Sequence, residues 1–295
     1  MGNIQATAVQ RRNFMIYMLA PALLLLVFFT MYPFIVNILN SLSHYNLTEP
    51  NNRYFVGLQN YFDLLKDKIF WQSLKQTLYF IAGAVGIEFF VGLGVAQLLL
   101  NDFKGRDILR TFFILPMGAT PIAISFVWKI MLNPELGIIN YILRIFGIHG
   151  MDWVGNPATV IPSLILIDAW CWTPFMLMVL SAGLLSLPQD PFEAAEIDGA
   201  SSYKKLIYIT IPLLRPLIFV ALLFRIIDAF RTFDIIYVIT GGGPGHYSET
   251  LNIHTYLQGF NFMRISSAST LAIVMLLILI FICTIIVKFY KSLEL

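Results

Sequence analysis

The stretch Leu187-Pro-Gln-Asp-Pro-Phe-Glu-Ala-Ala-Glu-Ile-Asp-Gly-Ala-Ser-Ser-Tyr-Lys-Lys-Leu-Ile-Tyr-Ile-Thr-Ile-Pro-Leu-Leu-Arg-Pro216 lies between two long apolar segments and carries signals for the start and the end of a helix. Asp190 can cap a helix N-terminus, Pro191 suits the first helical position, and Glu193 stands where a capping box places its acid. Gly199 stands where a left-handed residue would end the helix. A passive connecting loop has no need of these signals, so this stretch is predicted to fold.

A second helix is expected after this glycine, beginning at Ser201 or Ser202 and running to a break at Pro212. The first helix combines small residues, which allow a close approach to the backbone, with carboxylates that basic groups can bind. Acidic residues do not suit the inner leaflet of a membrane, which is itself negative. Docking to a protein is therefore favoured over an amphipathic helix that lies on lipid. The residues concerned are Glu193, Ala194, Ala195, Glu196, Asp198, Gly199 and Ala200.

The composition of the whole chain is that of a membrane protein. Of its 295 residues, 58% are hydrophobic and 12% are charged, whereas a soluble domain carries about 25% charged residues. The net charge is only +2 and no long basic run is present, so no nucleic-acid partner is expected. Cys171 and Cys283 both lie inside apolar runs and form no metal or redox motif, and no metal site is expected among the scattered histidines.

Six apolar segments are long enough to cross a bilayer, which takes about 20 helical residues. The fifth is the least secure by hydropathy, because several charged residues interrupt it. The predicted spans cover about residues 14–36, 77–100, 111–131, 159–187, 216–240 and 265–287. The fold class is therefore an all-α polytopic membrane protein, with one transmembrane domain over residues 1–295. Lys and Arg are more frequent in the loops on the N-terminal side, which predicts that both termini are cytoplasmic.

Two motifs identify a family that the chain resembles. Glu193-Ala194-Ala195-x-x-Asp198-Gly199-Ala200, followed by Ile209-x-Ile211-Pro212, is similar to the EAA loop of binding-protein-dependent ABC importer permeases. Phe233-Asp234-Ile235-Ile236-Tyr237-Val238-Ile239-Thr240-Gly241-Gly242-Gly243-Pro244 resembles carbohydrate-uptake permeases of the maltose and glycerol-3-phosphate type. The chain departs from the family at Ile211, where Leu is usual. Its first outer loop also lacks the large insertion of the maltose subunit, so the resemblance does not favour maltose in particular.

The resemblance implies a type I ABC importer permease fold, with the chain as the first of two paired permease subunits in a heterodimer. It also implies two cytoplasmic ATP-binding subunits, an extracytoplasmic solute-binding protein and a bacterial or archaeal plasma membrane. Residues 188–215 would form the coupling loop, with its ATPase contacts at Glu193, Ala194, Ala195, Asp198, Gly199 and Ala200. The chain has no G-x-x-x-x-G-K-[ST] motif, so ATP and Mg²⁺ are expected in the partner ATPase and this subunit is expected to be non-catalytic and to bind no cofactor.

Polar residues inside the predicted spans are the candidate substrate contacts, because ionisable groups at membrane depth usually face a cavity or a partner. Two faces carry them, one on the fourth span and one on the fifth, and both adjoin the coupling loop. Aromatic rings with hydrogen-bonding groups suit a sugar. The residues are Asp168, Trp172 and Phe175 on the fourth span, and Arg225, Asp228 and Thr232 on the fifth. The alternative is that Arg225 and Asp228 form an intrahelical ion pair, and Glu88 is expected to be a structural partner of a neighbouring span or of the second permease.

An importer permease for a sugar is thus the leading interpretation of the function. The alternative is an ion-coupled secondary transporter of a small polar solute that would use Glu88, Asp168 or Asp228 to carry protons or sodium ions. Internal repeats and broken helices are typical of such transporters, and the sequence shows neither. The outer turn Gly241-Gly242-Gly243-Pro244-Gly245 lacks the residues of a phosphate-binding loop. It is interpreted as a flexible turn that meets a solute-binding protein, or as a plain turn between spans.

Overall fold

The computed structural model describes residues 2–292, most of them in helices. The helices are α1 (Gly2–Ser41), α2 (Gln59–Lys66), α3 (Lys68–Leu98), α4 (Arg106–Ile114), α5 (Pro121–Met131), α6 (Ile138–Ile145), α7 (Val160–Leu185), α8 (Asp190–Ile197), α9 (Ser202–Lys205), α10 (Ile211–Phe230), α11 (Asp234–Ile239), α12 (Leu251–Tyr256) and α13 (Ile265–Ser292). A 3₁₀ turn covers Leu115–Gly118, and π-helical turns cover Leu206–Thr210 and Leu257–Asn261. Two short strands, β1 (Ser43–His44) and β2 (Tyr54–Phe55), pair antiparallel with Ser43 opposite Phe55.

The contacts of the chain group into two compact units. The first comprises Met1–Lys66 and Thr255–Val274, and in it Ser266 at the start of α13 exchanges backbone and side-chain hydrogen bonds with Tyr45. The second comprises Asp67–His254 and Met275–Leu295. The helix α13 contributes residues to both units, and the single domain over residues 1–295 stays a prediction.

Five of the predicted spans coincide with helices that are long and apolar enough to cross a membrane. They are Ile16–Ser41, Lys68–Leu98, Val160–Leu185, Ser202–Ile239 and Ile265–Ser292. The second span begins earlier than hydropathy predicts, because the side chain of Asp67 caps α3 by accepting a 2.8 Å hydrogen bond from the Ile69 amide. A helix can thus extend past its apolar stretch where a cap satisfies its first amides.

The third predicted span, 111–131, is not one straight helix. Arg106–Gly118 and Pro121–Met131 meet at an angle of 103°, so together they form a broken span or a re-entrant loop. Pro116 and Pro121 lack amide hydrogens, and the 3₁₀ turn that precedes the break ends at Gly118. The helical hydrogen bonds are therefore interrupted in the middle of the segment. The predicted span at 111–131 is therefore divided into two helices at residues 119–120.

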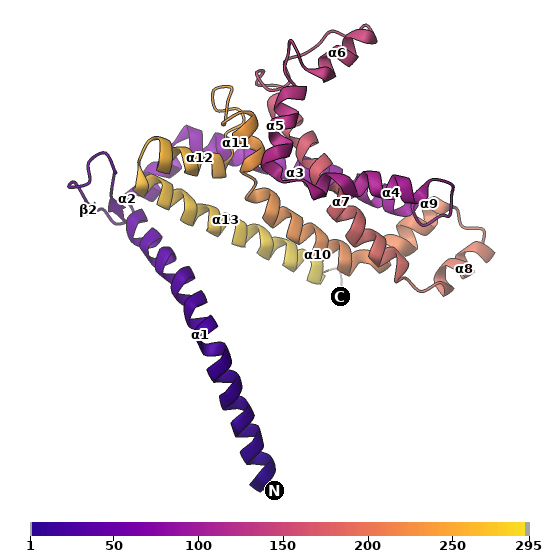
Figure 1. Cartoon of the computed structure of the whole chain (residues 1–295), viewed down its shortest axis with the longest axis horizontal. Coiled ribbons are helices and arrows are strands. Elements are labelled where there is room, and N and C mark those ends of the chain that lie inside the picture. Colours follow the sequence, from indigo (N-terminus) through magenta and orange to yellow (C-terminus); the bar gives the residue numbers. More distant parts are fainter. Residues whose placement is uncertain (1, 293–295) are drawn as a thin grey trace. The chain divides into compact units, whose positions relative to one another are not determined.

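The core of the second unit is formed by α3, α7 and α10 (Figure 1), and α7 packs most extensively against α3. Leu164, Met176 and Leu180 of α7 are fully buried. Gly92 on α3 makes the close approach possible, because a Cβ atom there would lie 2.8 Å from the Met176 Cβ atom and 3.2 Å from the Leu177 backbone nitrogen. This position fixes how near the two helices can come.

Gly92→Ala is therefore expected to destabilise the subunit by about 1–3 kcal/mol, since overpacking forces a helix to move. The matched control is Gly94→Ala, because nothing lies within 4 Å of a Cβ atom built at Gly94. Thermal unfolding of the purified protein in detergent measures the difference. Equal midpoints for the two variants would show that α3 and α7 do not approach each other at Gly92.

Candidate functional site

The hairpin formed by α8 and α9 is the first candidate site, and its first helix begins earlier than the sequence predicts. Gln189 has a helical backbone (φ −79°, ψ −31°) and precedes α8 without any side-chain cap. Its carbonyl accepts a 3.1 Å hydrogen bond from the Glu193 amide. Asp190 therefore lies inside the first turn, and the cap and capping box predicted for Asp190 and Glu193 are not formed. Both acids still favour a helix N-terminus through its dipole.

The predicted stop at Gly199 is confirmed. Gly199 has φ +70°, its amide donates to the Glu196 carbonyl at 3.0 Å, and the amide of Ala200 donates to the Ala195 carbonyl at 2.8 Å. This pair of bonds is a Schellman motif, which reverses the chain at a left-handed residue. The turn is thus fixed by the backbone of Gly199.

The second arm of the hairpin begins as predicted, with the Ser201 side chain accepting from the Lys204 amide at 3.4 Å. Lys205 then reaches back to the first arm and donates to Glu196 Oε1 at 2.8 Å. The pKa of the Glu196 carboxyl is lowered from its ordinary value by this hydrogen bond and by the lysine charge. The bridge joins the two arms at an exposed site, so it orients the hairpin more than it stabilises it.

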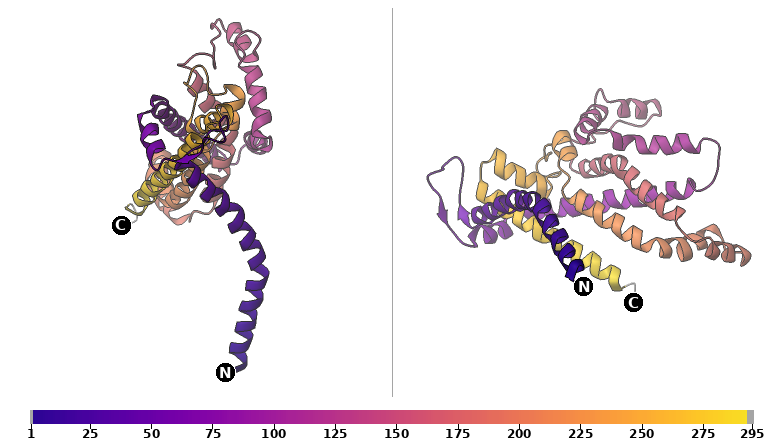
Figure 2. Two further views of the ribbon diagram at one scale, coloured as in Figure 1. Left: turned by 90° about the vertical axis from the view of Figure 1, so that its left-hand side faces the viewer. Right: turned by 60° about the horizontal axis from the view of Figure 1, so that its bottom comes forward.

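The predicted break at Pro212 was wrong, because α9 continues through a π-helical turn into α10 (Figure 2). A π turn contains one residue more than an α turn. It leaves the Lys205 carbonyl to accept a 3.3 Å hydrogen bond from the Thr210 hydroxyl. The helix thereby passes Pro212 without interruption.

The outward surface of the hairpin combines charge with an exposed apolar side chain. Glu193 and Asp198 are exposed, and neither has a side-chain partner within residues 2–292. Between them Ile197 is 88% exposed. The sequence interpretation missed Ile197, although an isolated apolar residue among acids was a visible signal. Of the small residues, Ala194 and Gly199 are exposed, while Ala195 and Ala200 are half-buried.

The second candidate site is a buried cluster of charged side chains around Arg225 of α10. Arg225 donates from Nε to Glu88 Oε2 at 2.6 Å and from Nη2 to Glu88 Oε1 at 2.9 Å. Nη2 also donates to Asp168 Oδ2, and Nη1 donates to Asp228 Oδ2 at 2.8 Å. One guanidinium thus joins α3, α7 and α10. The expectation that Glu88 pairs with a neighbouring span is confirmed, and so is the intrahelical pair of Arg225 with Asp228.

The remaining candidate substrate residues lie beside this cluster or near it in sequence. The Trp172 ring lies 4.9 Å from the Arg225 guanidinium carbon, a cation–π contact. Phe175 and Thr232 are half-buried. Asp168 Oδ1 is buried and has no hydrogen-bond partner in the described part of the chain. The structure thus joins Asp168, Trp172, Arg225 and Asp228 directly, and it shows no such contact for Phe175 or Thr232.

The loop that precedes α12 is braced by its own hydrogen bonds, and its contact with a solute-binding protein stays a prediction. The Ser248 hydroxyl lies 2.7 Å from the Thr240 hydroxyl, and Glu249 is buried between His246 and His254, both hydrogen-bonded to it. Burial acts to raise the pKa of Glu249, but the bonds from His254 and then His246 outweigh it and lower that pKa. Within residues 2–292, no three or more His, Cys, Asp or Glu side chains are grouped to hold a metal ion.

A lowered carboxyl pKa contributes stability that is complete above the ordinary value of 4.5 and is lost as the pH falls through the folded value. Unfolding of the wild-type protein is therefore expected to become easier on acidification below about pH 4.5. Glu249→Gln is expected to lose that part of the pH dependence, because Gln does not titrate. Parallel pH profiles of wild type and Glu249→Gln, measured as unfolding midpoints in detergent, would contradict the expectation.

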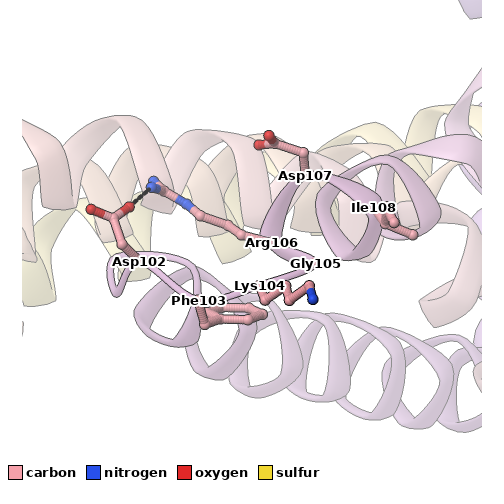
Figure 3. Close-up of a pocket in the computed structure, with 7 residues that line it drawn as sticks. All are labelled: Asp102, Phe103, Lys104, Gly105, Arg106, Asp107 and Ile108. Atoms are coloured by element: carbon pink, nitrogen blue, oxygen red, sulfur yellow. Dashed lines mark hydrogen bonds and ion pairs between the residues drawn. The ribbon is translucent and has the colours of Figure 1, made fainter.

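One pocket lies at the loop after α3 and a second lies beside the hairpin, where the buried Thr210 is one of the lining residues. One of about 610 Å³ is formed by Asp102–Ile108, where Arg106 donates to Asp102 at 2.6 Å and no lining residue is buried (Figure 3). The other, of about 530 Å³, lies between the end of α3 and the hairpin and includes Phe192, Glu196 and Lys205. The hairpin is therefore not packed tightly against the end of α3.

Long apolar helices, with a folded hairpin between two of them, are the features of a polytopic membrane protein. The model of the family described as "Binding-protein-dependent transport system inner membrane component" matches residues 88–294. The chain is 39% identical over 248 residues to the trehalose/maltose transport system permease protein MalF of Thermococcus litoralis, covering 84% of this chain and 82% of that one. The chain belongs to the family of binding-protein-dependent ABC importer permeases.

Two solved structures have the same fold as this chain. One is a bacterial ABC transporter involved in the import of the acidic polysaccharide alginate, with a TM-score of 0.84 and 20% identity over 98% of both chains. The other is the bacterial alginate ABC transporter in complex with an alginate pentasaccharide-bound periplasmic protein, with a TM-score of 0.80 and 20% identity over 98% of this chain and 96% of that chain. The predicted type I importer permease fold is therefore confirmed.

Proposed function

We propose that this chain is a permease subunit of an ATP-driven importer of a sugar, a di- or oligosaccharide or a related glycoside. It forms half of the translocation pathway and is coupled to a cytoplasmic ATPase through residues 188–215. The hairpin carries this proposal: a turn fixed at Gly199 holds Glu193, Asp198 and the 88%-exposed Ile197 on one outward surface, and neither acid has a side-chain partner in the described residues. Carboxylates with an apolar side chain suit a protein cleft that contains basic groups.

The ATPase would move the hairpin when it binds ATP and its two subunits close. Glu193 anchors the hairpin by a charge-assisted hydrogen bond, and Ala194, Ala195 and Ala200 allow the close approach. The helix from α9 into α10 carries the movement to the membrane helices, which makes alternating access a rigid-body change. ATP and Mg²⁺ bind to the ATPase, and this chain binds no cofactor.

The sugar is inferred from the relatives and from the chemistry of α7 and α10. The trehalose/maltose and alginate transporters are both named for carbohydrates. Aromatic faces with carboxylate and hydroxyl groups suit hydroxylated rings. The substrate path would include Asp168, Trp172, Phe175, Arg225, Asp228 and Thr232.

The complete transporter would contain this chain, a second homologous permease as its heterodimeric partner and two ATP-binding subunits on the cytoplasmic side. An extracytoplasmic solute-binding protein would deliver the sugar, as the complex of the alginate transporter with its periplasmic protein suggests by analogy. Both termini are cytoplasmic in this proposal, in the plasma membrane of a bacterium or an archaeon. The orientation follows from the distribution of Lys and Arg.

An ion-coupled secondary transporter is the second candidate, favoured by the broken helix pair α4–α5 and by the buried carboxylates Glu88 and Asp168. Uptake of labelled disaccharide by proteoliposomes that contain the complete transporter separates the two. The importer predicts uptake that requires internal ATP and persists after proton and sodium gradients are collapsed. Uptake that stops with the gradients and continues without ATP would reverse the assignment.

A further inference from the structure

The guanidinium of Arg225 has almost no free donor left for a substrate. An arginine carries five N–H groups, and four of those of Arg225 are engaged: one from Nε, two from Nη2 and one from Nη1. The indole of Trp172 covers one face of the guanidinium. Arginine frequently binds phosphate and carboxylate groups through two parallel donors, and Arg225 has only one N–H group left without a partner in the described residues.

The exposed edge of the cluster is a carboxylate and not the guanidinium. The Arg225 side chain is 1% exposed, whereas that of Asp228 is 51% exposed. Only Oδ2 of Asp228 is engaged, by Arg225 Nη1, in the described part of the chain. A solute that reaches the cluster from this side therefore meets the Asp228 carboxylate before it meets the Arg225 guanidinium.

The cluster contains more hydrogen-bond acceptors than donors. Three carboxyl groups surround one guanidinium, and Asp168 Oδ1 is buried without a partner in the described residues. A group that brings donors can be accommodated beside such a cluster, but a group that brings only acceptors adds unpaired negative charge. Sugar hydroxyls bring donors, whereas phosphate and uronate groups bring acceptors.

We propose that this permease takes uncharged glycosides and excludes anionic ones, with Asp228 as the residue that determines this specificity. The inference rests on the proposed function. A neutral sugar donates a hydroxyl hydrogen bond to the free oxygen of Asp228. A sugar phosphate or a sugar acid is repelled by the same carboxylate, and Arg225 cannot compensate because Glu88, Asp168 and Asp228 already bind it.

The test measures binding to the purified complete transporter without the solute-binding protein, so that selection by that protein does not enter. Labelled trehalose and trehalose 6-phosphate are compared by equilibrium dialysis. The Kd of trehalose 6-phosphate is expected to be at least about tenfold higher, since like charges in contact cost several kcal/mol before screening. The ratio is expected to shrink as salt is raised, because Asp228 is partly exposed.

Asp228→Asn keeps the shape of the side chain and removes its charge, so it is expected to reduce the Kd ratio at least about threefold. Asp102→Asn is the control, because it neutralises an exposed carboxylate outside the cluster and outside the proposed substrate path, so it should leave the ratio unchanged. Equal Kd values in the wild type, or a ratio that Asp228→Asn does not change, would overturn the proposal while ATP-driven sugar uptake stands. A transporter that shows neither ATP-driven uptake nor binding of any neutral mono- or disaccharide would overturn the proposed function itself.

Discussion

Replacing Gly199 by valine is expected to abolish ATP-driven uptake while the subunit still inserts into the membrane and assembles. The left-handed backbone at φ +70° is strained for a β-branched residue, so the Schellman turn would open. Glu193 and Ile197 would then leave the surface that we propose for ATPase docking. Sugar uptake into proteoliposomes and the rate of ATP hydrolysis are measured on the same preparation. In the variant, ATP hydrolysis is expected to continue without any accompanying sugar uptake.

The matched control is Gly199→Asn, because asparagine tolerates the left-handed region far better than valine. Nothing lies within 4 Å of a Cβ atom at this position, so the backbone conformation alone separates the two substitutions. Asn is therefore expected to retain most of the uptake. Normal uptake by Gly199→Val, or equal loss in both variants, would refute a role for this turn geometry in coupling.

Replacing Arg225 by methionine is expected to have the largest effect on stability, because it leaves Glu88 and Asp168 buried without their shared cation. Breaking a buried ion pair from one side costs about 3–5 kcal/mol. The variant should express poorly or unfold at a much lower temperature. The midpoint of thermal unfolding in detergent, or the yield of folded subunit, measures this loss.

Neutralising the carboxylates along with the arginine provides the decisive comparison. Arg225→Met combined with Glu88→Gln and Asp168→Asn removes the unpaired charges and is expected to recover much of the lost stability. The recovered protein is still expected to transport poorly, since Asp228 would lose the guanidinium that positions it. A triple variant no more stable than Arg225→Met would mean that the cluster does not hold α3, α7 and α10 together.

Local sequence signals predicted the spans and the hairpin well, because apolar length and a left-handed stop are properties of a few neighbouring residues. The glycine stop and the start at Ser201 are such cases. The errors also have local causes. The break at 119–120 follows from Pro116, Gly118 and Pro121. The mean hydropathy of a long segment does not register the helix-breaking effect of these single residues. The helix continues past Pro212 because a π-helical turn precedes it. The helix propensities of the individual residues do not predict such a turn.

The charged cluster was only partly predictable, because it joins residues far apart in the sequence. The pair of Arg225 with Asp228 follows from a spacing of three on one helix. Glu88 lies 137 positions from Arg225, and Asp168 lies 57 positions from it, so no spacing rule brings them together. Their burial at 0% exposure was equally invisible, although charge inside an apolar span indicated that each needed a partner.

The unbroken helix from Ser202 to Phe230 connects the hairpin of α8 and α9 directly to the buried charged cluster around Arg225. At a rise of 1.5 Å per residue, Arg225 lies about 35 Å from Ser202 along that axis, so a tilt of about 10° moves one end by about 6 Å relative to the other. The break expected at Pro212 is absent, so no irregular segment separates the hairpin from Arg225. If the hairpin is moved by an ATPase, as we propose, the same helix would carry that movement to the three helices that Arg225 joins.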